Sequence, residues 1–335
     1  MQSTHMLIGS QSPMTHPDTE RPRRWMVIIV KCFISCMLIL WLLKDTSLHD
    51  IFKVLQSSCL PLMLLAFSLH FLGCFISVLR WRVLLLCQNI DISLSFLLKS
   101  YMAAIFFNNL LPSTIGGDVL RIHDTYRAGK NKAGAVTAVL VDRLLGILVL
   151  MGFVFFSLLS SERFNIYFSF VNKLIALVVV VFTISFIIFI LYMYNKKISQ
   201  FYLKTNNTVI KTITDIIKKA IDLLIVFKND KKTLYISVLL SIALQINVVL
   251  YYFLISNSSG ISISINEFFF IVPVAVFFMM MPISINGLGL RENIFVFMLS
   301  TYGVSKNNAI AFSWADYGMI LSLGIIGGIV YILRK

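Results

Sequence analysis

The sequence predicts an all-α integral membrane protein, a polytopic helical bundle with six spanning helices and two re-entrant broken helices in an inverted repeat. Hydrophobic residues make up 58% of the 335 residues and charged residues only 13%, whereas soluble domains average about 45–50% and about 25%. Several apolar runs are long enough to cross a bilayer, and two shorter ones end in similar Pro and Gly segments. A water-soluble fold could not bury this much apolar surface.

Each spanning helix needs about 20 apolar residues to cross about 30 Å of hydrocarbon. Six runs meet this requirement, at residues 25–43, 59–79, 133–160, 171–194, 234–256 and 308–333. We expect them to form a single membrane domain, 25–335, after a disordered cytoplasmic tail, 1–24. The Lys-rich segment 195–233 is expected to be a basic cytoplasmic loop whose amphipathic helix lies on anionic headgroups.

Two further apolar stretches, 92–111 and 266–281, run directly into helix-breaking residues. The predicted breaks contain Pro112, Gly116 and Gly117 in the first segment and Pro282, Gly287 and Gly289 in the second. Such a break frees backbone N–H and C=O groups that hydrocarbon cannot satisfy, so it must line protein or a wet cavity. We therefore expect two helices that enter the membrane and return on the same side.

The charge distribution favours this topology. The protein carries a formal net charge of +14, and Lys and Arg concentrate in cytoplasmic loops of membrane proteins. If both broken segments re-enter, most of the basic residues fall on the side that holds the amino terminus. We expect both termini in the cytoplasm, and we expect no nucleic-acid partner.

The two breaks also resemble each other. Five of ten aligned positions are identical and 170 residues apart, with Pro112, Ile115, Gly117, Leu120 and Arg121 matching Pro282, Ile285, Gly287, Leu290 and Arg291. The predicted topology places the copies, about 59–160 and about 234–333, in opposite orientations. Inverted repeats of this kind hold the binding site of many transporters near the bilayer midplane. The alternative is two unrelated loops that share Pro and Gly.

Charged residues inside these apolar segments are the candidate substrate-binding residues. Arg121 and Arg291 each follow a break, and a guanidinium near a helix amino terminus suits a phosphate group. Alternatively, they pair with Asp118 and Glu292 or reach the membrane interface. Because charges at this depth are costly, they are rarely without a role.

A second charged pair, Asp142 and Arg143, lies within the apolar run 133–160. Adjacent helical residues point about 100° apart, so each needs a different partner. We expect Asp142 to meet Arg121 or Arg291, with Arg143 in the same cavity, or alternatively a purely structural ion pair between helices. Asn109 either contacts a headgroup or caps backbone carbonyls beside the first break.

Together, these motifs resemble the lysylphosphatidylglycerol synthetase transmembrane, or flippase-like, family. They comprise Arg80-Trp81-Arg82, Asn108 to Pro112, Gly116 to Arg121, Asp142 to Gly146, and Gly287-Leu288-Gly289-Leu290-Arg291-Glu292. The resemblance implies a multi-pass protein of the bacterial inner membrane, similar to the flippase part of multiple-peptide-resistance factors without their synthetase domain.

The expected function is therefore translocation of a phospholipid or phosphate-linked lipid headgroup between leaflets. We expect no enzymatic activity, cofactor or metal. The expected partners are anionic membrane lipids and an enzyme that makes the lipid. Two alternatives stay open. One is an integral-membrane transferase acting on a lipid carrier, with Asp118 or Asp142 as base, and the other is a membrane scaffold. The sequence does not determine the oligomeric state.

Overall fold

The computed structural model describes residues 48–110, 115–160, 230–280, 284 and 287–334, together with helical positions 33, 36, 37 and 40. The predicted tail, the span 171–194, the loop 195–233 up to residue 229, and all of the span 25–43 except those four positions lie outside the described residues. Pro112 and Pro282 lie outside them as well. Every regular element in the described ranges is a helix.

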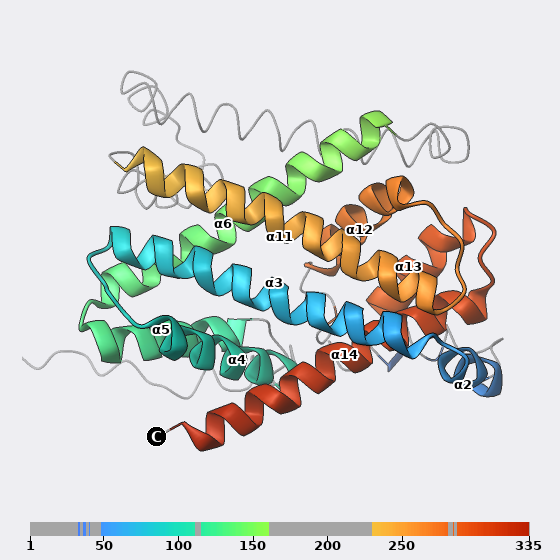
Figure 1. The fold of residues 1–335 in the computed structure, drawn as a ribbon, viewed down its shortest axis with the longest axis horizontal. Coiled ribbons are helices and arrows are strands. Elements are labelled where there is room, and N and C mark those ends of the chain that lie inside the picture. Colours follow the sequence, from blue (N-terminus) through green and yellow to red (C-terminus); the bar gives the residue numbers. More distant parts are fainter. Residues whose placement is uncertain are drawn as a thin grey trace, which may run out of the picture.

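Four long helices form the frame of the fold: α3 (Leu60–Cys87), α6 (Lys132–Ser160), α11 (Lys231–Ser258) and α14 (Lys306–Leu333). All four are long and apolar enough to cross a membrane, since 28 residues extend about 42 Å at 1.5 Å per residue. They correspond to four of the six predicted spans. Helices α3 and α11 pack side by side and run in opposite directions (Figure 1).

The predicted end of the second span at residue 79 is wrong. Helix α3 continues to Cys87, because the residues after Arg82 are again apolar, Val83-Leu84-Leu85-Leu86. Arg80 is therefore a helical residue with 6% exposure, and not a charge in a cytoplasmic loop.

The first predicted break separates α4 (Leu94–Leu110) from α5 (Ile115–Gly129). These helices pack against each other, so the chain reverses direction between them. Gly116 and Gly117 were predicted to lie in the break, but they are within the first turn of α5. A side chain at Gly117 would collide with the carbonyl oxygen of Ala104 on α4, so the glycine permits close packing of the hairpin.

The second predicted break separates α12 (Ile265–Met279) from α13 (Leu290–Ser300), which also pack against each other. Gly287 and Gly289 have φ angles of 76° and 78°, a left-handed conformation that favours glycine. Gly289 is the N-cap of α13, and the Glu292 carboxylate accepts a hydrogen bond from its N–H at 2.7 Å. This helix begins where the sequence predicts.

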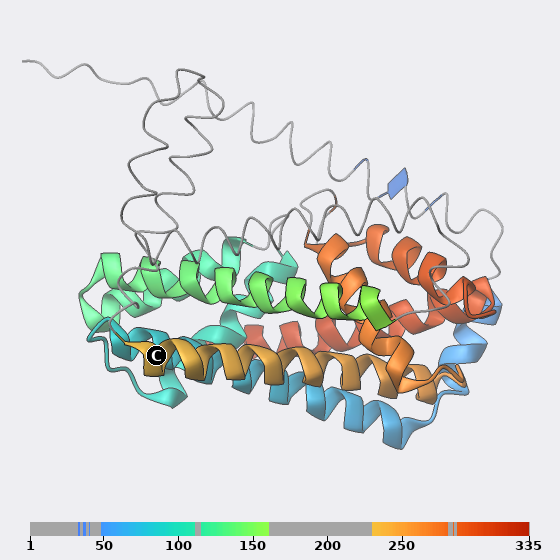
Figure 2. The same cartoon turned by 90° about the horizontal axis from the view of Figure 1, so that it is seen from above.

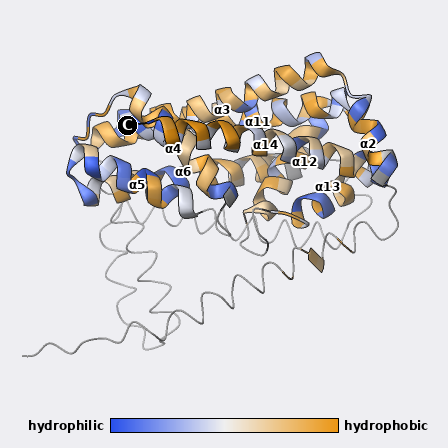
Figure 3. Ribbon diagram, turned by 90° about the horizontal axis from the view of Figure 1, so that it is seen from below, coloured by the Kyte–Doolittle hydropathy of each residue, from blue (hydrophilic) through white to orange (hydrophobic). Residues whose placement is uncertain are grey.

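The short helices lie at the two ends of the long ones. Helices α4 and α5 gather at one end and α12 and α13 toward the other (Figures 1 and 2), and α2 (Leu48–Gln56) packs against α14 at that second end. Hydrophobic residues line the long helices and hydrophilic residues collect toward their ends (Figure 3). Gly327 on α14 lets α4 approach, because an added side chain there would collide with the Met102 carbonyl oxygen.

Candidate functional site

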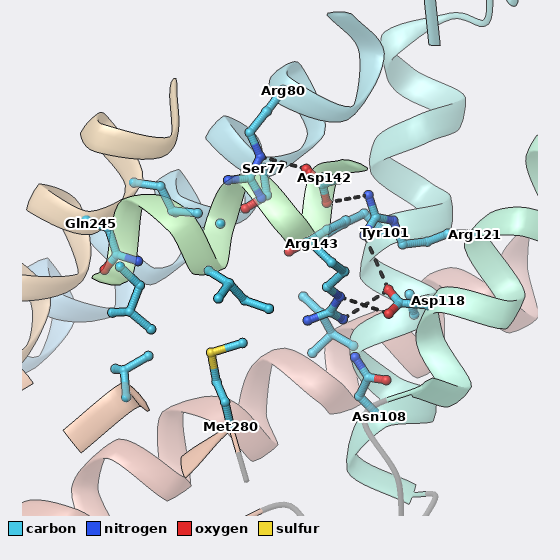
Figure 4. Close-up of a pocket in the computed structure, with 17 residues that line it drawn as sticks. Ser77, Arg80, Tyr101, Asn108, Asp118, Arg121, Asp142, Arg143, Gln245 and Met280 are labelled. Atoms are coloured by element: carbon cyan, nitrogen blue, oxygen red, sulfur yellow. Dashed lines mark hydrogen bonds and ion pairs between the residues drawn. The ribbon is translucent and has the colours of Figure 1, made fainter. Parts of the chain in front are cut away.

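A cavity of about 210 Å³ lies among α3, α4, α5, α6, α11 and the end of α12. One part of its lining is strongly polar and carries three arginines and two aspartates. These residues are Arg80, Asp118, Arg121, Asp142 and Arg143, seen together in Figure 4. The lining from α11 and the end of α12 contains Leu244, Val276 and Met280. The cavity is therefore amphipathic.

Asp142 on α6 is the centre of a buried ion cluster. Its Oδ1 accepts from Arg80 Nε at 2.6 Å and its Oδ2 from Arg121 Nη2 at 3.1 Å. All three side chains are at most 7% exposed. Because both carboxylate oxygens are bound by guanidinium groups, the burial of this charge is compensated.

Neighbouring groups hold the two arginines of the cluster in place. Arg80 Nη1 donates to the Ser241 hydroxyl of α11 at 2.8 Å, which ties α3 to α11. The Arg121 guanidinium lies over the Trp81 ring, 4.3 Å from its centroid, in a cation–π arrangement.

Arg143, the next residue on α6, takes a different partner. Its Nε and Nη2 donate to the two oxygens of Asp118 at 2.8 and 3.0 Å, a bidentate pair. Asp118 also accepts from Arg121 at 3.4 Å, one turn away on α5. The Arg143 side chain is 42% exposed, whereas that of Arg121 is 4% exposed. Arg143 is thus the accessible guanidinium of the cavity.

The charges of the cavity lining do not balance. Three guanidinium groups face two carboxylates, which leaves one positive charge in excess. A chemical group that enters the cavity and restores neutrality would be an anion, and guanidinium groups bind carboxylate and phosphate in the same forked geometry.

Arg291 belongs to a second buried cluster. It pairs with Asp316 on α14 at 3.3 Å, and Asp316 also accepts from the hydroxyls of Tyr251 at 2.7 Å and Tyr252 at 3.2 Å. The Arg291 guanidinium lies over the ring of Tyr317 at 5.4 Å. Neither Arg291 nor Glu292 is among the residues that line the cavity.

The structure therefore separates the predicted site residues into two groups. Of the two partners expected for Asp142, Arg121 is in contact and Arg291 pairs elsewhere. Asn109 does not line the cavity, and its amide donates to the Ile320 carbonyl of α14 at 3.0 Å. The neighbouring Asn108 lines the cavity instead, and its side-chain oxygen accepts from Gly117 N–H at 2.8 Å.

Sequence reasoning missed Arg80 and Asp316 as partners in these clusters. Asp316 could have been recognised from the sequence, because it is a carboxylate within the predicted span 308–333, and intramembrane charges usually face protein partners. The predicted span 59–79 ends before Arg80 and so leaves that arginine outside the membrane segments. No group of three or more His, Cys, Asp or Glu side chains within the described ranges could hold a metal ion.

The long apolar helices and the charged cavity between them define a multi-pass helical membrane protein. Residues 28–328 match the model of the family described as the lysylphosphatidylglycerol synthase TM region, and the chain belongs to this family. It is a family of membrane domains associated with lipid handling. The resemblance noted in the sequence is confirmed. A search of curated proteins for relatives of the chain found no match.

Proposed function

We propose that the protein translocates a lipid between membrane leaflets by holding its phosphate-bearing headgroup in the cavity while the acyl chains remain in hydrocarbon. The observation that carries this proposal is the uncompensated positive charge of the lining, with Arg143 accessible. Arg143 Nη1 makes no hydrogen bond to a described residue, so it is available to a phosphate oxygen. The cavity is smaller than the 300–1,000 Å³ typical of sites that enclose a small molecule, and it suits a headgroup.

The proposed mechanism also includes an inverted repeat. Helices α3 and α11 begin at residues 60 and 231, and α4 and α12 at 94 and 265, so each pair is offset by 171 positions. The next two pairs, α5 with α13 and α6 with α14, are offset by 175 and 174 positions at their starts. These offsets support a duplication that extends beyond the ten positions aligned in the sequence.

The helix contacts support the same symmetry. Helix α4 packs on α14, and its counterpart α12 packs on α6, the counterpart of α14. Likewise, α5 packs on α6 and α13 packs on α14. The opposite directions of α3 and α11 (Figure 1) favour an inverted relationship between the halves. In this arrangement the α4–α5 and α12–α13 hairpins are re-entrant from opposite faces.

The two ion clusters occupy equivalent places in this proposed repeat. Arg121 pairs with Asp142 on α6, and 170 positions after Arg121, Arg291 pairs with Asp316 on α14. Inverted repeats allow alternating access because each half can adopt the conformation of the other. We propose that the two hairpins alternate in admitting the headgroup, first from one leaflet and then from the other.

The proposed setting is the bacterial inner membrane, with two further spans outside the described residues and both termini in the cytoplasm. The charge asymmetry of the sequence supports this orientation. The transferase alternative is less well supported, because Asp118 and Asp142 each bind guanidinium groups through both oxygens, so neither carboxylate has an unpaired oxygen to act as a base. An enzyme that makes the lipid remains a proposed partner.

The test is a leaflet-transfer assay in proteoliposomes with Arg143→Gln. The wild type is expected to move a headgroup-labelled phospholipid, and the variant to move it about tenfold more slowly or worse, since a hydrogen bond to a charged group contributes about 1.5–3 kcal/mol. A neutral glycolipid with the same chains is the comparison lipid. Arg127→Gln is the matched control, because Arg127 is exposed on α5 and does not line the cavity.

Two results would count against the proposal. If the wild type leaves phospholipids and polyprenyl phosphates on their starting leaflet, translocation is wrong. If Arg143→Gln and Arg127→Gln behave alike while both proteins remain folded, the cavity arginine has no part in transfer, and a scaffold role is favoured.

A further inference from the structure

The part of the cavity lining contributed by α11 contains one polar side chain, Gln245. Its neighbours in the lining from α11 and the end of α12 are Leu244, Val276 and Met280. Figure 4 shows Gln245 on the side of the cavity opposite Asp118 and Arg143. The cavity thus offers a charged end and, across it, a neutral amide set in an apolar wall.

This amide has no hydrogen-bond partner in the described part of the chain. Gln245 is 9% exposed, and its buried Oε1 accepts no hydrogen bond. Most buried side-chain polar atoms in proteins have a partner, so an unpaired one needs an explanation. Asn247, two residues further along α11, behaves in the usual way, because its amide donates to the Leu69 carbonyl oxygen at 2.9 Å.

We propose that Gln245 is a specificity-determining residue that hydrogen-bonds a hydroxyl group on the distal part of the lipid headgroup. This inference rests on the proposed function, in which the phosphate binds at Arg143. The substrate class is then an anionic phosphodiester lipid whose headgroup carries hydroxyl groups beyond the phosphate.

The chemistry of the wall favours a hydroxyl over an ammonium group. An amide both donates and accepts, as a hydroxyl does. An ammonium group needs a negative partner when it leaves water, and the two carboxylates of the lining, Asp118 and Asp142, are already bound to arginines. A headgroup that ends at the phosphate would leave the Gln245 amide unpaired, and sites with an unpaired buried polar group discriminate strongly against such ligands.

The test compares equilibrium binding of three short-chain lipids to the purified full-length protein. The probes are dihexanoyl phosphatidylglycerol, which has distal hydroxyls, dihexanoyl phosphatidylethanolamine, which has an ammonium, and dihexanoyl phosphatidic acid, which has neither. The wild type is expected to bind the glycerol lipid about tenfold more tightly than the other two, a difference of about 1.4 kcal/mol. Gln245→Leu is expected to bring the ratio of the glycerol lipid to phosphatidic acid close to one.

The matched control is Gln88→Leu, since Gln88 follows α3 and does not line the cavity. Gln245→Leu should fold at least as stably as the wild type, because replacing an unpaired buried amide with an apolar side chain of similar size removes a desolvation penalty. Gln245→Asn, which keeps the amide on a shorter chain, should give an intermediate ratio.

The outcomes separate this inference from the proposed function. If both anionic lipids bind in an Arg143-dependent way but Gln245→Leu leaves their ratio unchanged, the role of Gln245 is wrong and the phosphate site stands. A wild type that favours the ethanolamine lipid also overturns the inference. If no probe binds the wild type, both this inference and the proposed function are wrong.

Discussion

Replacing Asp142 with asparagine should destabilise the protein more than the same substitution at Asp118 or Asp91. Asp142 is 3% exposed and accepts from Arg80 at 2.6 Å and Arg121 at 3.1 Å. The substitution preserves the shape of the side chain but leaves two buried guanidinium groups without this counter-charge. Breaking a buried ion pair by removing one partner costs about 3–5 kcal/mol, and we expect a loss in that range.

Two other substitutions calibrate the Asp142→Asn measurement. Asp118→Asn should cost less, because its partner Arg143 is 42% exposed and solvent compensates the lost charge. Asp91→Asn should be nearly neutral, since its carboxylate is 79% exposed and lies 3.7 Å from Arg82, and exposed pairs contribute about 0–1 kcal/mol.

The assay is unfolding in mixed micelles, with sodium dodecyl sulfate as denaturant and helicity followed by circular dichroism. The reasoning predicts that the order of destabilisation is Asp142→Asn, then Asp118→Asn, then Asp91→Asn. An Asp142→Asn protein that unfolds within about 0.5 kcal/mol of the wild type, the usual range for surface substitutions, would refute the claim that this cluster holds the helices together.

Three further predictions concern packing, capping and topology. Gly327→Leu should separate α14 from α4 and lower the free energy of unfolding by about 1–3 kcal/mol, as overpacking usually does, with unfolding in mixed micelles as the measurement and an unchanged stability as the contrary result. Hydrogen bonds from the Thr233 hydroxyl and N–H lower the pKa of Asp230, the N-cap of α11. The stabilisation from this cap should therefore be fully present at pH values above the usual pKa of an aspartate, and it should be lost as the pH falls through the lowered pKa. Hydrogen exchange at the start of α11 should therefore accelerate in acid in the wild type but not in Asp230→Asn, and equal acid sensitivity would contradict this. Cysteines placed at the exposed positions Asn89 and Asn257, in a background without native cysteines, should react with impermeant reagents from opposite faces of the membrane, and labelling from one face would disprove the orientation of α3 and α11.

Much of the fold could be predicted because apolar run length determines where a chain can cross a bilayer. The predicted spans 133–160, 234–256 and 308–333 lie within three residues of α6, α11 and α14 at both ends. The span at 59–79 was too short because a hydropathy run ends at its first charge, whereas the helix itself continues when that charge has a buried partner. Arg80 has such a partner in Asp142, 62 positions later in the chain.

The candidate site was less predictable because its ion pairs also join residues that are far apart in the sequence. The sequence indicates that Asp142 and Arg143 need separate partners, because helix geometry alone requires this. It does not indicate which partners, since Arg121 and Arg291 have equivalent local surroundings in the sequence. The choice depends on α5 packing against α6 and α13 packing against α14, which is a property of the tertiary fold.

The most direct test of the central claim is an experimental density map of the protein in nanodiscs that contain an anionic phospholipid. Our account predicts phosphate density in the cavity, within about 2.7–3.2 Å of an Arg143 nitrogen, with acyl-chain density continuing into the bilayer. A cavity occupied by acyl chain alone, with every headgroup at the membrane surface, would contradict it.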